Sequence, residues 1–308
     1  MRLNLVLNRN AGALRGRDPK ATAEELADIF RAHGHSVEVH VLSGREAIDA
    51  IARICRNADS DALIAGGGDG TISAAAAAAA ESSFTLGVLP LGTMNLFARS
   101  LGIPLKPAAA AEGLASAEAV AVDIGDVNGR FFTHHVTLGL HPRMIRMRER
   151  LSYASRLGKI WASGQAWWMA VRQSPRLDLL IKADGESFRR RTAAILVSNN
   201  PLGEGHLPYA DDPRQGRFGV YVATARRPQQ LTQLTAQIVL GNISDNPLLE
   251  WWLAKEVEIA PALAEVQASV DGELVTLAAP LKFTLHRGGL YVLKPRPRGA
   301  GLALPPRR

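Results

Sequence analysis

The stretch ALIAGGGDGTIS, residues 62–73, decides the fold of this chain. Its first four residues are apolar and predict a buried β-strand, and the residues from Thr71 onward predict a helix of small residues that packs closely on a sheet. The glycines between them predict a turn too tight for side chains. Adjacent glycines let a ligand approach the backbone, and a helix start offers free N–H groups with a partial positive charge, so the loop suits a phosphate.

The spacing of these glycines matches neither of the two common phosphate-binding patterns, GxxxxGKS/T and GxGxxG. On spacing alone, a purely structural tight turn explains the glycines as well as an anion site does.

Composition and charge limit the classes of protein to which this chain can belong. Its 308 residues suffice for one large or two ordinary domains, and a hydrophobic content of 47% is enough to build buried cores. The formal charge of +7 favours anionic partners, which include nucleotide phosphates, an anionic membrane and nucleic acid. The only cysteine, Cys55, excludes an intrachain disulfide and has the helical spacing of a buried residue.

Two further features of the sequence exclude common classes of protein. Polar residues interrupt the first ten positions, which therefore do not read as a signal peptide, and no run approaches the roughly 18 apolar residues of a membrane span. We expect a cytoplasmic protein without transmembrane segments. The histidines lack the helical spacing or the paired cysteines of zinc sites, so no transition-metal site is predicted.

Short strands and helices alternate through the first half of the chain. The predicted strands are residues 3–7, 36–42, 62–65 and 85–89, and the predicted helices are residues 19–32, 45–56, 71 onward and 94–101. This alternation predicts an α/β domain with a parallel sheet and right-handed crossovers over residues 1–125. Ligands of such sheets bind at the carboxyl ends of the strands, where the loop of residues 66–71 also lies.

After residue 125 the pattern changes to antiparallel pairing. Asn-Gly or Asp-Gly pairs, typical of two-residue hairpin turns, stand at residues 128–129, 184–185 and 271–272. The predicted strands are residues 119–124, 177–182, 190–198, 218–223, 266–270, 281–285 and 290–293. Residues 126–294 are therefore expected to form a mainly antiparallel β-sandwich domain, and residues 295–308 a basic, flexible tail.

Residues 144–171 combine apolar residues at roughly helical spacing with arginines and tryptophans. A basic helix with tryptophans suits a membrane surface, because its cations meet lipid phosphates while the indole rings lie among the head groups. A helix that packs its apolar stripe on the sandwich and leaves its arginines in solvent explains the pattern equally well. For Trp251 and Trp252 the alternatives are again contact with a membrane surface and packing in the core. On a strand, only one of the two is expected to face the core.

The glycine motif is followed by PLGTMNLFAR at residues 90–99, and together the two motifs resemble the diacylglycerol kinase catalytic family. That family includes bacterial lipid kinases, sphingosine kinases and ceramide kinases, and it is distantly similar to NAD kinases. The resemblance covers most of the chain. It implies an NAD kinase-like fold for residues 1–125 and a transfer of the γ-phosphoryl group of ATP, with Mg²⁺, to the hydroxyl of a lipid.

The resemblance also implies which residues bind the nucleotide. They are Asn10, Gly12, Ser43, Gly66, Gly67, Gly68, Asp69, Gly70, Thr71, Gly92, Thr93 and Asn95. Turn chemistry alone also explains Asn10, Gly12 and Ser43, whose surroundings differ from the family's usual motif. Thr93 stands beside a glycine at a helix start, where a threonine either caps the helix or turns its hydroxyl to a phosphate.

Three carboxylates carry the implied chemistry. Asp69 lies inside the glycine loop, where a carboxylate would repel phosphate unless a metal ion or a substrate hydrogen lay between them, so it is a candidate metal ligand or organiser of the reacting groups. A turn-forming side chain is the alternative. Asp271 and Glu273 belong to an Asp-Gly-Glu motif that matches the family, which implies Glu273 as the general base and Asp271 as its partner. Without the resemblance, the Asp-Gly pair indicates only a turn.

The sequence departs from the family pattern before one of the predicted strands. Relatives commonly carry Asp-Asp-Gly-x-Leu-Asp there, whose first half helps to hold a structural Mg²⁺. Here Gln215 and Gly219 occupy positions that are usually acidic. Asp211 and Asp212, just upstream, are the candidate metal ligands that remain. Another departure, at residues 138–141, leaves the acceptor open among diacylglycerol, phosphatidylglycerol, a sphingoid base and ceramide.

These observations predict a lipid kinase that works at the inner face of the cytoplasmic membrane, with ATP and a lipid as partners and no nucleic acid. The sequence leaves the oligomeric state open, a dimer included. One rival is a kinase of a soluble alcohol such as NAD, against which the basic, tryptophan-containing segment argues. Another is a non-catalytic nucleotide- or lipid-binding protein, against which Asp69 and Glu273 argue.

Overall fold

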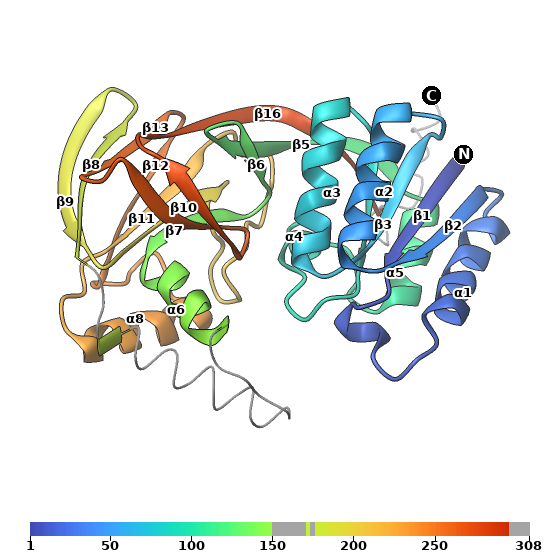
Figure 1. Cartoon of the computed structure of the whole chain (residues 1–308), viewed down its shortest axis with the longest axis horizontal. Helices are drawn as coiled ribbons and strands as arrows, with labels where there is room; N and C mark the ends of the chain where they lie inside the picture. Colours follow the sequence, from blue (N-terminus) through green and yellow to red (C-terminus); the bar gives the residue numbers. More distant parts are fainter. Residues whose placement is uncertain (150–170, 173–175, 296–308) are drawn as a thin grey trace, which may run out of the picture. The chain divides into compact units, whose positions relative to one another are not determined.

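The computed structural model describes residues 1–149, 171–172 and 176–295 of the chain. The chain divides into two compact units (Figure 1): unit 1 consists of Met1–Val122 together with the chain from Leu290, and unit 2 consists of Asp123–Gly289. Most of the predicted basic, tryptophan-containing segment and of the predicted tail lies outside the described residues.

Unit 1 alternates strands and helices. Its elements are β1 (Arg2–Asn8), η1 (Gly12–Leu14), α1 (Pro19–Ala32), β2 (Ser36–Leu42), α2 (Gly44–Asn57), β3 (Ala62–Gly67), α3 (Asp69–Ser82), β4 (Leu86–Pro90), α4 (Leu96–Ser100) and α5 (Pro107–Ala115), and the strands shared with unit 2 are β5 (Glu118–Val127) and β16 (Leu281–Lys294). The strand order is β2-β1-β3-β4-β16, and each neighbouring pair is parallel. The predicted α/β fold with a parallel sheet is confirmed.

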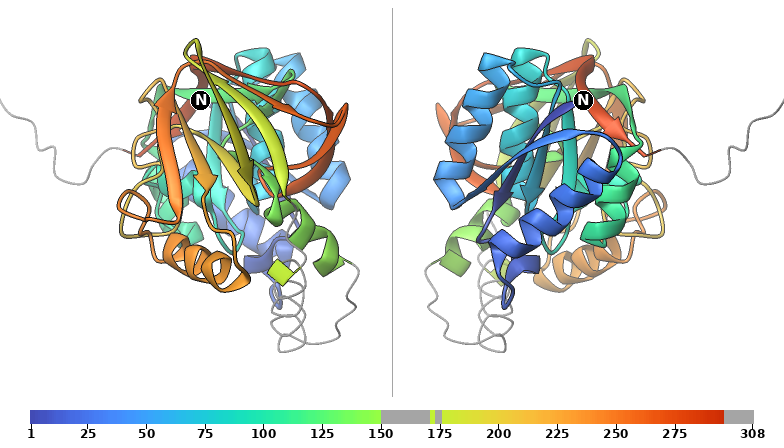
Figure 2. Two further views of the ribbon diagram at one scale, coloured as in Figure 1. Left: turned by 90° about the vertical axis from the view of Figure 1, so that its left-hand side faces the viewer. Right: turned by 90° about the vertical axis from the view of Figure 1, so that its right-hand side faces the viewer.

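Helices cover both faces of this sheet, as the right panel of Figure 2 shows. Right-handed crossovers place the helix after β1 on one face and the helices after β2 and β3 on the other, because the chain moves along the sheet in opposite directions. Accordingly, α1 packs against α5, and α2 packs against α3. All six residues of β3 are buried between these layers. Cys55 on α2 is buried as predicted, and burial raises the pKa of its thiol to about 11.

Unit 2 is built mainly of antiparallel strands. Its further elements are β6 (Arg130–Phe132), β7 (His135–Gly139), α6 (Leu140–Glu149), β8 (Leu177–Ala183), β9 (Glu186–Thr192), β10 (Ala194–Asn199), β11 (Phe218–Ala223), α8 (Pro228–Val239), β12 (Leu249–Ala254), β13 (Val257–Pro261), β14 (Glu265–Val270) and β15 (Glu273–Ala278). A six-stranded sheet has the order β12-β11-β10-β7-β14-β15, and a second set runs β16-β13-β8-β9. Apolar residues of both sheets form one core, so the predicted antiparallel architecture is confirmed.

The three predicted hairpins are present. Asn128, Asp184 and Asp271 have φ angles of 51°, 46° and 47°, and the glycine after each has a φ of 81°, 87° and 91°. Two successive residues with positive φ define the turn that matches the twist of a hairpin, and Asn or Asp followed by Gly is the pair that tolerates it.

Other parts of unit 2 differ from the prediction. The predicted strand 190–198 is divided at Ala193, because β9 pairs in one sheet and β10 in the other. The predicted strands 281–285 and 290–293 are one strand, β16, whose last part pairs with β4 and so belongs to unit 1. Helices α5 and α8 and strands β7, β12, β13 and β15 were not predicted. On β12, Trp252 packs against the core while Trp251 is 37% exposed, as expected of neighbours on a strand.

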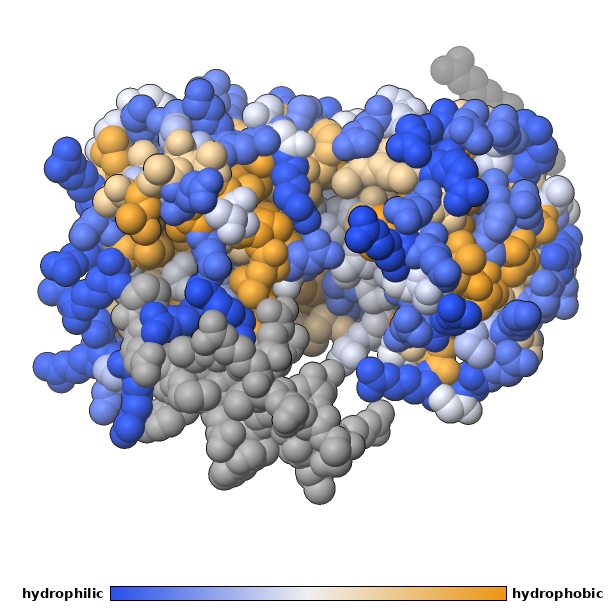
Figure 3. Space-filling view, in the orientation of Figure 1, coloured by the Kyte–Doolittle hydropathy of each residue, from blue (hydrophilic) through white to orange (hydrophobic). Residues whose placement is uncertain are grey.

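Hydrophilic residues are interspersed with hydrophobic ones over the described parts of the face in Figure 3. Among the described residues, no helix combines the length and the apolar character that crossing a membrane requires.

Candidate active site

Three loops of unit 1 meet at the carboxyl edge of its parallel sheet. The N–H of Leu91 donates to the carbonyl of Gly67 over 3.0 Å, and the N–H of Ala13 donates to the carbonyl of Leu91 over 2.9 Å. Parallel strands end at the same edge of a sheet, so the loops that follow them become neighbours. These loops, called here the three-loop site, comprise residues 9–14, 66–71 and 91–95.

Packing restricts three glycines of the three-loop site. A Cβ atom at Gly67 would lie 2.5 Å from the Cβ of Thr71, and a Cβ at Gly66 would lie 3.1 Å from two leucine side chains. A Cβ at Gly92 would lie 2.7 Å from the Cα of Gly68, so two of the loops approach each other backbone to backbone. Gly67 and Gly92 are therefore closed to a side chain, whereas at Gly66 the two leucines would have to shift by a few tenths of an ångström.

Gly68 and Gly12 are glycines that the fold does not require. Gly68 has a φ of −85°, which any residue adopts, and a Cβ there would meet only the Cα of Gly92, at an ordinary contact distance of 3.6 Å. A Cβ at Gly12 would lie 3.7 Å from Oγ1 of Thr93. Gly68 is also the N-cap of α3, whose first N–H groups have no acceptor within their own helix. Open backbone beside a helix N-terminus suits a phosphate.

Asp69 ties the glycine loop to the loop after β4. Its Oδ1 accepts the N–H of Leu96 over 2.7 Å, and its Oδ2 accepts the N–H of Asn95 over 3.1 Å. Asn95 in turn accepts the N–H of Gly92 through its Oδ1 over 2.8 Å, and its φ is 52°. The carboxylate therefore holds the start of α4 rather than a turn in its own loop. The predicted roles of Asp69 at the metal and of Asn95 at the nucleotide stay predictions.

Asn8, which sequence reasoning did not select, contacts two predicted site residues. Its Nδ2 donates to the hydroxyl of Thr71 over 3.0 Å, and its Oδ1 accepts the N–H of Asn10 over 3.0 Å. Thr71 is buried and fixed to the end of β1, whereas Thr93 is exposed. The position of Asn8 at the carboxyl end of the first strand is the sequence feature by which it could have been found.

Ser43 caps helix α2 in the loop after β2. Its Oγ donates to Glu46 over 2.5 Å, and Glu46 also pairs with Arg9 at 3.6 Å. The hydrogen bonds from Ser43 lower the pKa of the Glu46 carboxyl. Ser43 thus has a structural role at this edge of the sheet, and its contact with a nucleotide stays a prediction.

In unit 2, the carboxylate of Asp271 is fully engaged by a distant loop. Its Oδ2 accepts the N–H and the hydroxyl of Thr133 over 2.7 and 2.9 Å, and its Oδ1 accepts the N–H groups of His134 and His135 over 2.9 and 3.0 Å. A carboxylate has about four lone-pair positions. Asp271 therefore anchors the segment that joins β6 to β7, in addition to forming the turn.

Glu273, at the start of β15, is placed differently. Its side chain is 53% exposed and pairs with Arg130 at 2.9 Å. Arg130 lies on β6 and was not selected from the sequence. Of the two acidic residues in the motif, Glu273 is thus the more exposed one, and its predicted role as the general base stays a prediction.

The sheet face that carries Asp271 is polar where α6 covers it. Thr137 on β7 lies opposite Ser269 on β14, and the N–H of Asp271 donates to the carbonyl of His135 over 3.0 Å. From α6, Nδ1 of His141 lies 2.9 Å from Oγ1 of Thr137. A helix that packs on a sheet normally covers apolar side chains. This layer instead buries hydroxyl and imidazole groups beside the Asp-Gly-Glu motif.

Burial favours the neutral form of two adjacent imidazoles, those of His134 and His135. Burial lowers the pKa of His134 to about 4. Burial also lowers the pKa of His135 well below its ordinary value, and the neighbouring His134 and His141 lower it further. Burial favours the neutral imidazole because the charged form loses its hydration in the interior.

The two candidate metal-binding aspartates each have a basic partner. Asp211 lies 2.8 Å from Nε2 of His206, and Asp212 lies 3.0 Å from Nε of Arg214. In the part of the chain that the structure describes, no group of three or more His, Cys, Asp or Glu residues could hold a metal ion. The residues present do not fit a structural Mg²⁺.

Known proteins resemble this chain in sequence. The family model of the diacylglycerol kinase catalytic domain matches residues 2–127. The "Probable lipid kinase YegS-like" of Pseudomonas fluorescens is 40% identical over 243 residues, which cover 76% of this chain and 77% of that protein. The diacylglycerol kinase of Bacillus subtilis is 24% identical over 292 residues, which cover 90% of this chain and 92% of that protein.

The fold itself has solved counterparts. A crystal structure of a diacylglycerol kinase from Bacillus anthracis matches with a TM-score of 0.73 at 19% identity, and the match covers 95% of this chain and 96% of that one. At that identity the likeness shows the fold alone. Together with the 40% identity to the Pseudomonas protein over most of its length, these matches show that the chain belongs to the diacylglycerol kinase catalytic-domain family, a family of lipid kinases.

Proposed function

We propose that this protein transfers the γ-phosphoryl group of ATP to the hydroxyl group of a lipid at a membrane surface. The observation that carries the proposal is the open backbone at Gly68 and Gly12, beside the first turn of α3. A glycine that the fold does not require indicates space kept for a ligand, and a helix N-terminus favours an anion. The phosphates of the nucleotide are the anion that a kinase must hold.

Asp69 supports phosphate binding by fixing the loops around it. Each of its oxygens accepts one N–H group from the loop after β4 and keeps a further lone pair, so the carboxylate can also face a metal ion. Mg²⁺, when bound with the nucleotide, neutralises charge on the phosphates. The loops of this chain orient the nucleotide, and they exclude side chains from the space that it needs.

On the acceptor side, we assign the proton transfer to Glu273. Its carboxylate is half-exposed and is oriented by Arg130, whereas all the acceptor positions of Asp271 are occupied. The names of the relatives, diacylglycerol kinase and lipid kinase, support a lipid as acceptor. The formal charge of +7 supports an anionic membrane surface as the place where that lipid is met.

A transfer assay tests the proposal. The protein is incubated with labelled ATP and Mg²⁺, either with vesicles of a total lipid extract or with NAD, and the products are separated. We expect label in a lipid, and we expect Glu273→Gln to lower that transfer by about 10²- to 10⁴-fold while ATP binding is kept, because general-base assistance is worth that much.

Three other outcomes would contradict the proposal. Label in NAD alone indicates a kinase of a soluble alcohol. ATP binding without any transfer indicates a nucleotide-binding protein that is not catalytic. Full transfer by a folded Glu273→Gln variant removes Glu273 from the reaction.

A further inference from the structure

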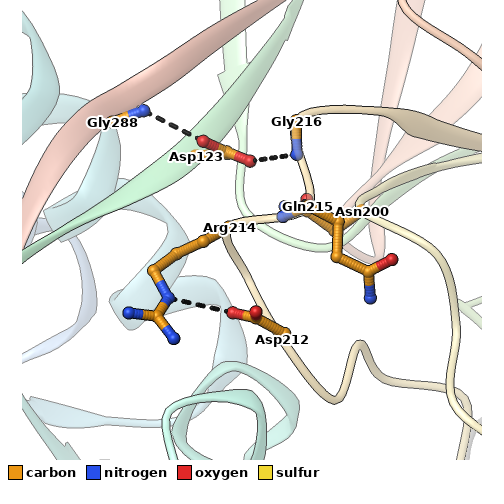
Figure 4. A network of polar contacts seen from close by, with 7 residues as sticks. All are labelled: Asp123, Asn200, Asp212, Arg214, Gln215, Gly216 and Gly288. Carbon is orange, nitrogen blue, oxygen red and sulfur yellow. Dashed lines mark hydrogen bonds and ion pairs between the residues drawn. The ribbon is translucent and has the colours of Figure 1, made fainter.

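The loop of residues 210–217 in unit 2 lies where the family resemblance implies a structural Mg²⁺, and in this chain it is held by other means. We propose that the loop folds without a metal ion. The carboxylate of Asp123 and the amide oxygen of Asn200 accept hydrogen bonds from its backbone N–H groups, and the guanidinium of Arg214 replaces a metal cation beside Asp212. Figure 4 shows these residues together.

Asp123 is the buried acceptor of this network. It is 4% exposed, its Oδ2 accepts the N–H of Gly216 over 2.7 Å, and its Oδ1 accepts the N–H of Gly288 over 2.9 Å. Its own N–H donates to the carbonyl of Pro213 over 2.8 Å. Asp123 thus holds the loop at Pro213 and at Gly216, and its carboxylate ties the loop to Gly288 on β16. Hydrogen bonds to a carboxylate are among the strong ones.

Asn200 holds the middle of the loop. It is fully buried, and its Oδ1 accepts the N–H of Gln215 over 2.8 Å. The N–H groups of Gln215 and Gly216 are therefore both satisfied by side chains that come from other parts of unit 2. The backbone conformation that a metal ion would otherwise stabilise is already determined.

The acidic side chains of the loop are occupied by basic groups. Nε of Arg214 lies 3.0 Å from Oδ1 of Asp212, and Figure 4 shows the Arg214 side chain turned back over that aspartate. His206 pairs with Asp211 at 2.8 Å. Because Asp212 and Arg214 are 45% and 54% exposed, their ion pair adds little stability. Its effect is to neutralise the carboxylate that a divalent cation would need.

The position of the missing acidic residue on β11 is closed as well. A Cβ atom at Gly219 would lie 2.6 Å from the ring of Tyr221 and 2.7 Å from Oγ of Ser198. A carboxylate cannot enter this space without displacing the tyrosine, whose hydroxyl accepts the N–H of Leu202 over 2.9 Å. Side chains of the protein thus fill the place where the family pattern has a carboxylate.

Thermal unfolding without nucleotide tests the proposal, and its readout is independent of phosphoryl transfer. Tryptophan fluorescence follows unit 2 through Trp251 and Trp252, which lie on β12. We expect the midpoint of the wild-type protein to agree within about 1 °C between EDTA and millimolar Mg²⁺, since an ion that does not bind cannot shift the equilibrium. A rise of several degrees with Mg²⁺ that Asp212→Asn abolishes would overturn the proposal.

A pair of variants tests the role of Asp123. Asp123→Asn should lower the midpoint by several degrees, equally in EDTA and in Mg²⁺, because an amide offers one acceptor oxygen where the N–H groups of Gly216 and Gly288 require two. Asp178→Asn, at a carboxylate that is 67% exposed, is the matched control and should change the midpoint little. An Asp123→Asn protein as stable as the wild type would contradict the proposed network. If that variant does not fold, the comparison of the wild-type protein in EDTA and Mg²⁺ still tests whether the loop needs a metal ion.

Discussion

Glycine serves two different purposes in the loop of residues 66–71. Gly67 is needed because the side chain of Thr71 occupies the space of a Cβ atom, and at Gly66 a Cβ would press against two leucine side chains. Gly68 has an ordinary φ and free space around its missing Cβ, so its identity is explained by what must approach it from outside. The same motif thus contains residues that stabilise the fold and a residue that keeps room for a ligand.

Exchanging these glycines one at a time should separate the two purposes. We expect Gly68→Ala to keep the stability of the wild-type protein and to weaken ATP binding by about tenfold or more, because the methyl group enters the space proposed for a phosphate. Gly67→Ala should instead lower stability, because its Cβ would collide with Thr71. Calorimetric titration with ATP and thermal unfolding measure the two effects, and unchanged ATP affinity in Gly68→Ala would contradict a phosphate at this position.

Asp69 combines a structural and a proposed chemical role, which a matched pair of variants can distinguish. Asp69→Ala removes the acceptor of two N–H groups at the start of α4 and should lower the free energy of unfolding by about 1–2 kcal/mol. Asp18→Ala removes the N-cap acceptor of α1 and should cost about as much. Only Asp69→Ala should lose phosphoryl transfer. Equal activity in the two variants would show that Asp69 acts through stability alone.

At the scale of single elements, the hairpin turns show how far the sequence leads. Asn-Gly and Asp-Gly mark all three turns, because the required backbone is local to two residues. The second role of Asp271 could not be predicted, since its hydrogen-bond partners begin at Thr133, 138 positions earlier in the chain. The same limit applies to Asp69 and Asn8, whose partners lie in loops that only the folded sheet brings together.

The turns at Asp184 and Asp271 can be compared to determine what the carboxylate contributes. Asp184 uses only Oδ1, which accepts the N–H groups of Lys255 and Glu256, so Asn can keep both bonds. Asp271 uses both oxygens, so Asn must turn its NH₂ group towards backbone donors. Both turns have a positive φ, which Asn tolerates.

We therefore expect Asp184→Asn to change the free energy of unfolding by less than about 0.5 kcal/mol and Asp271→Asn to lower it by about 2–4 kcal/mol. Urea unfolding of the two variants measures the difference. Similar losses in both variants would mean that the turn, and not the anchored loop, determines the effect.

Across the whole molecule, the architecture was more predictable than the individual strands. Periodicity 3.6 in the helices and the apolar strands between them indicated the parallel sheet of unit 1. In unit 2, β15 was missed because it is an edge strand that exposes half of its residues, and its sequence ELVTLA lacks an apolar alternation. The polar layer under α6 could not be predicted either, because a sequence does not show which faces of the strands a helix will cover.

That polar layer determines how unit 2 should respond to acid. In the unfolded chain, His134 and His135 take up protons near their ordinary pKa of about 6.5. In the folded protein, burial lowers the pKa of His134 to about 4 and lowers that of His135 as well, with Asp271 as the one neighbouring group that opposes the shift of His135. The unfolded state therefore binds more protons between these pH values, and stability must fall as the pH falls through this window.

We expect the free energy of unfolding to be constant between about pH 7 and pH 8 and to fall towards pH 4.5, with His134 alone contributing about 3 kcal/mol over its full window. Urea unfolding followed by tryptophan fluorescence measures this in unit 2. We assign the loss of stability above pH 4.5 to the histidines. The carboxyls of Glu204, Glu250 and Glu258 have lowered pKa values and are protonated only below that pH. His134→Asn should flatten the slope by about 1.4 kcal/mol per pH unit. A wild-type protein whose stability is the same at pH 7 and pH 5 would show that these imidazoles are not buried in the neutral form.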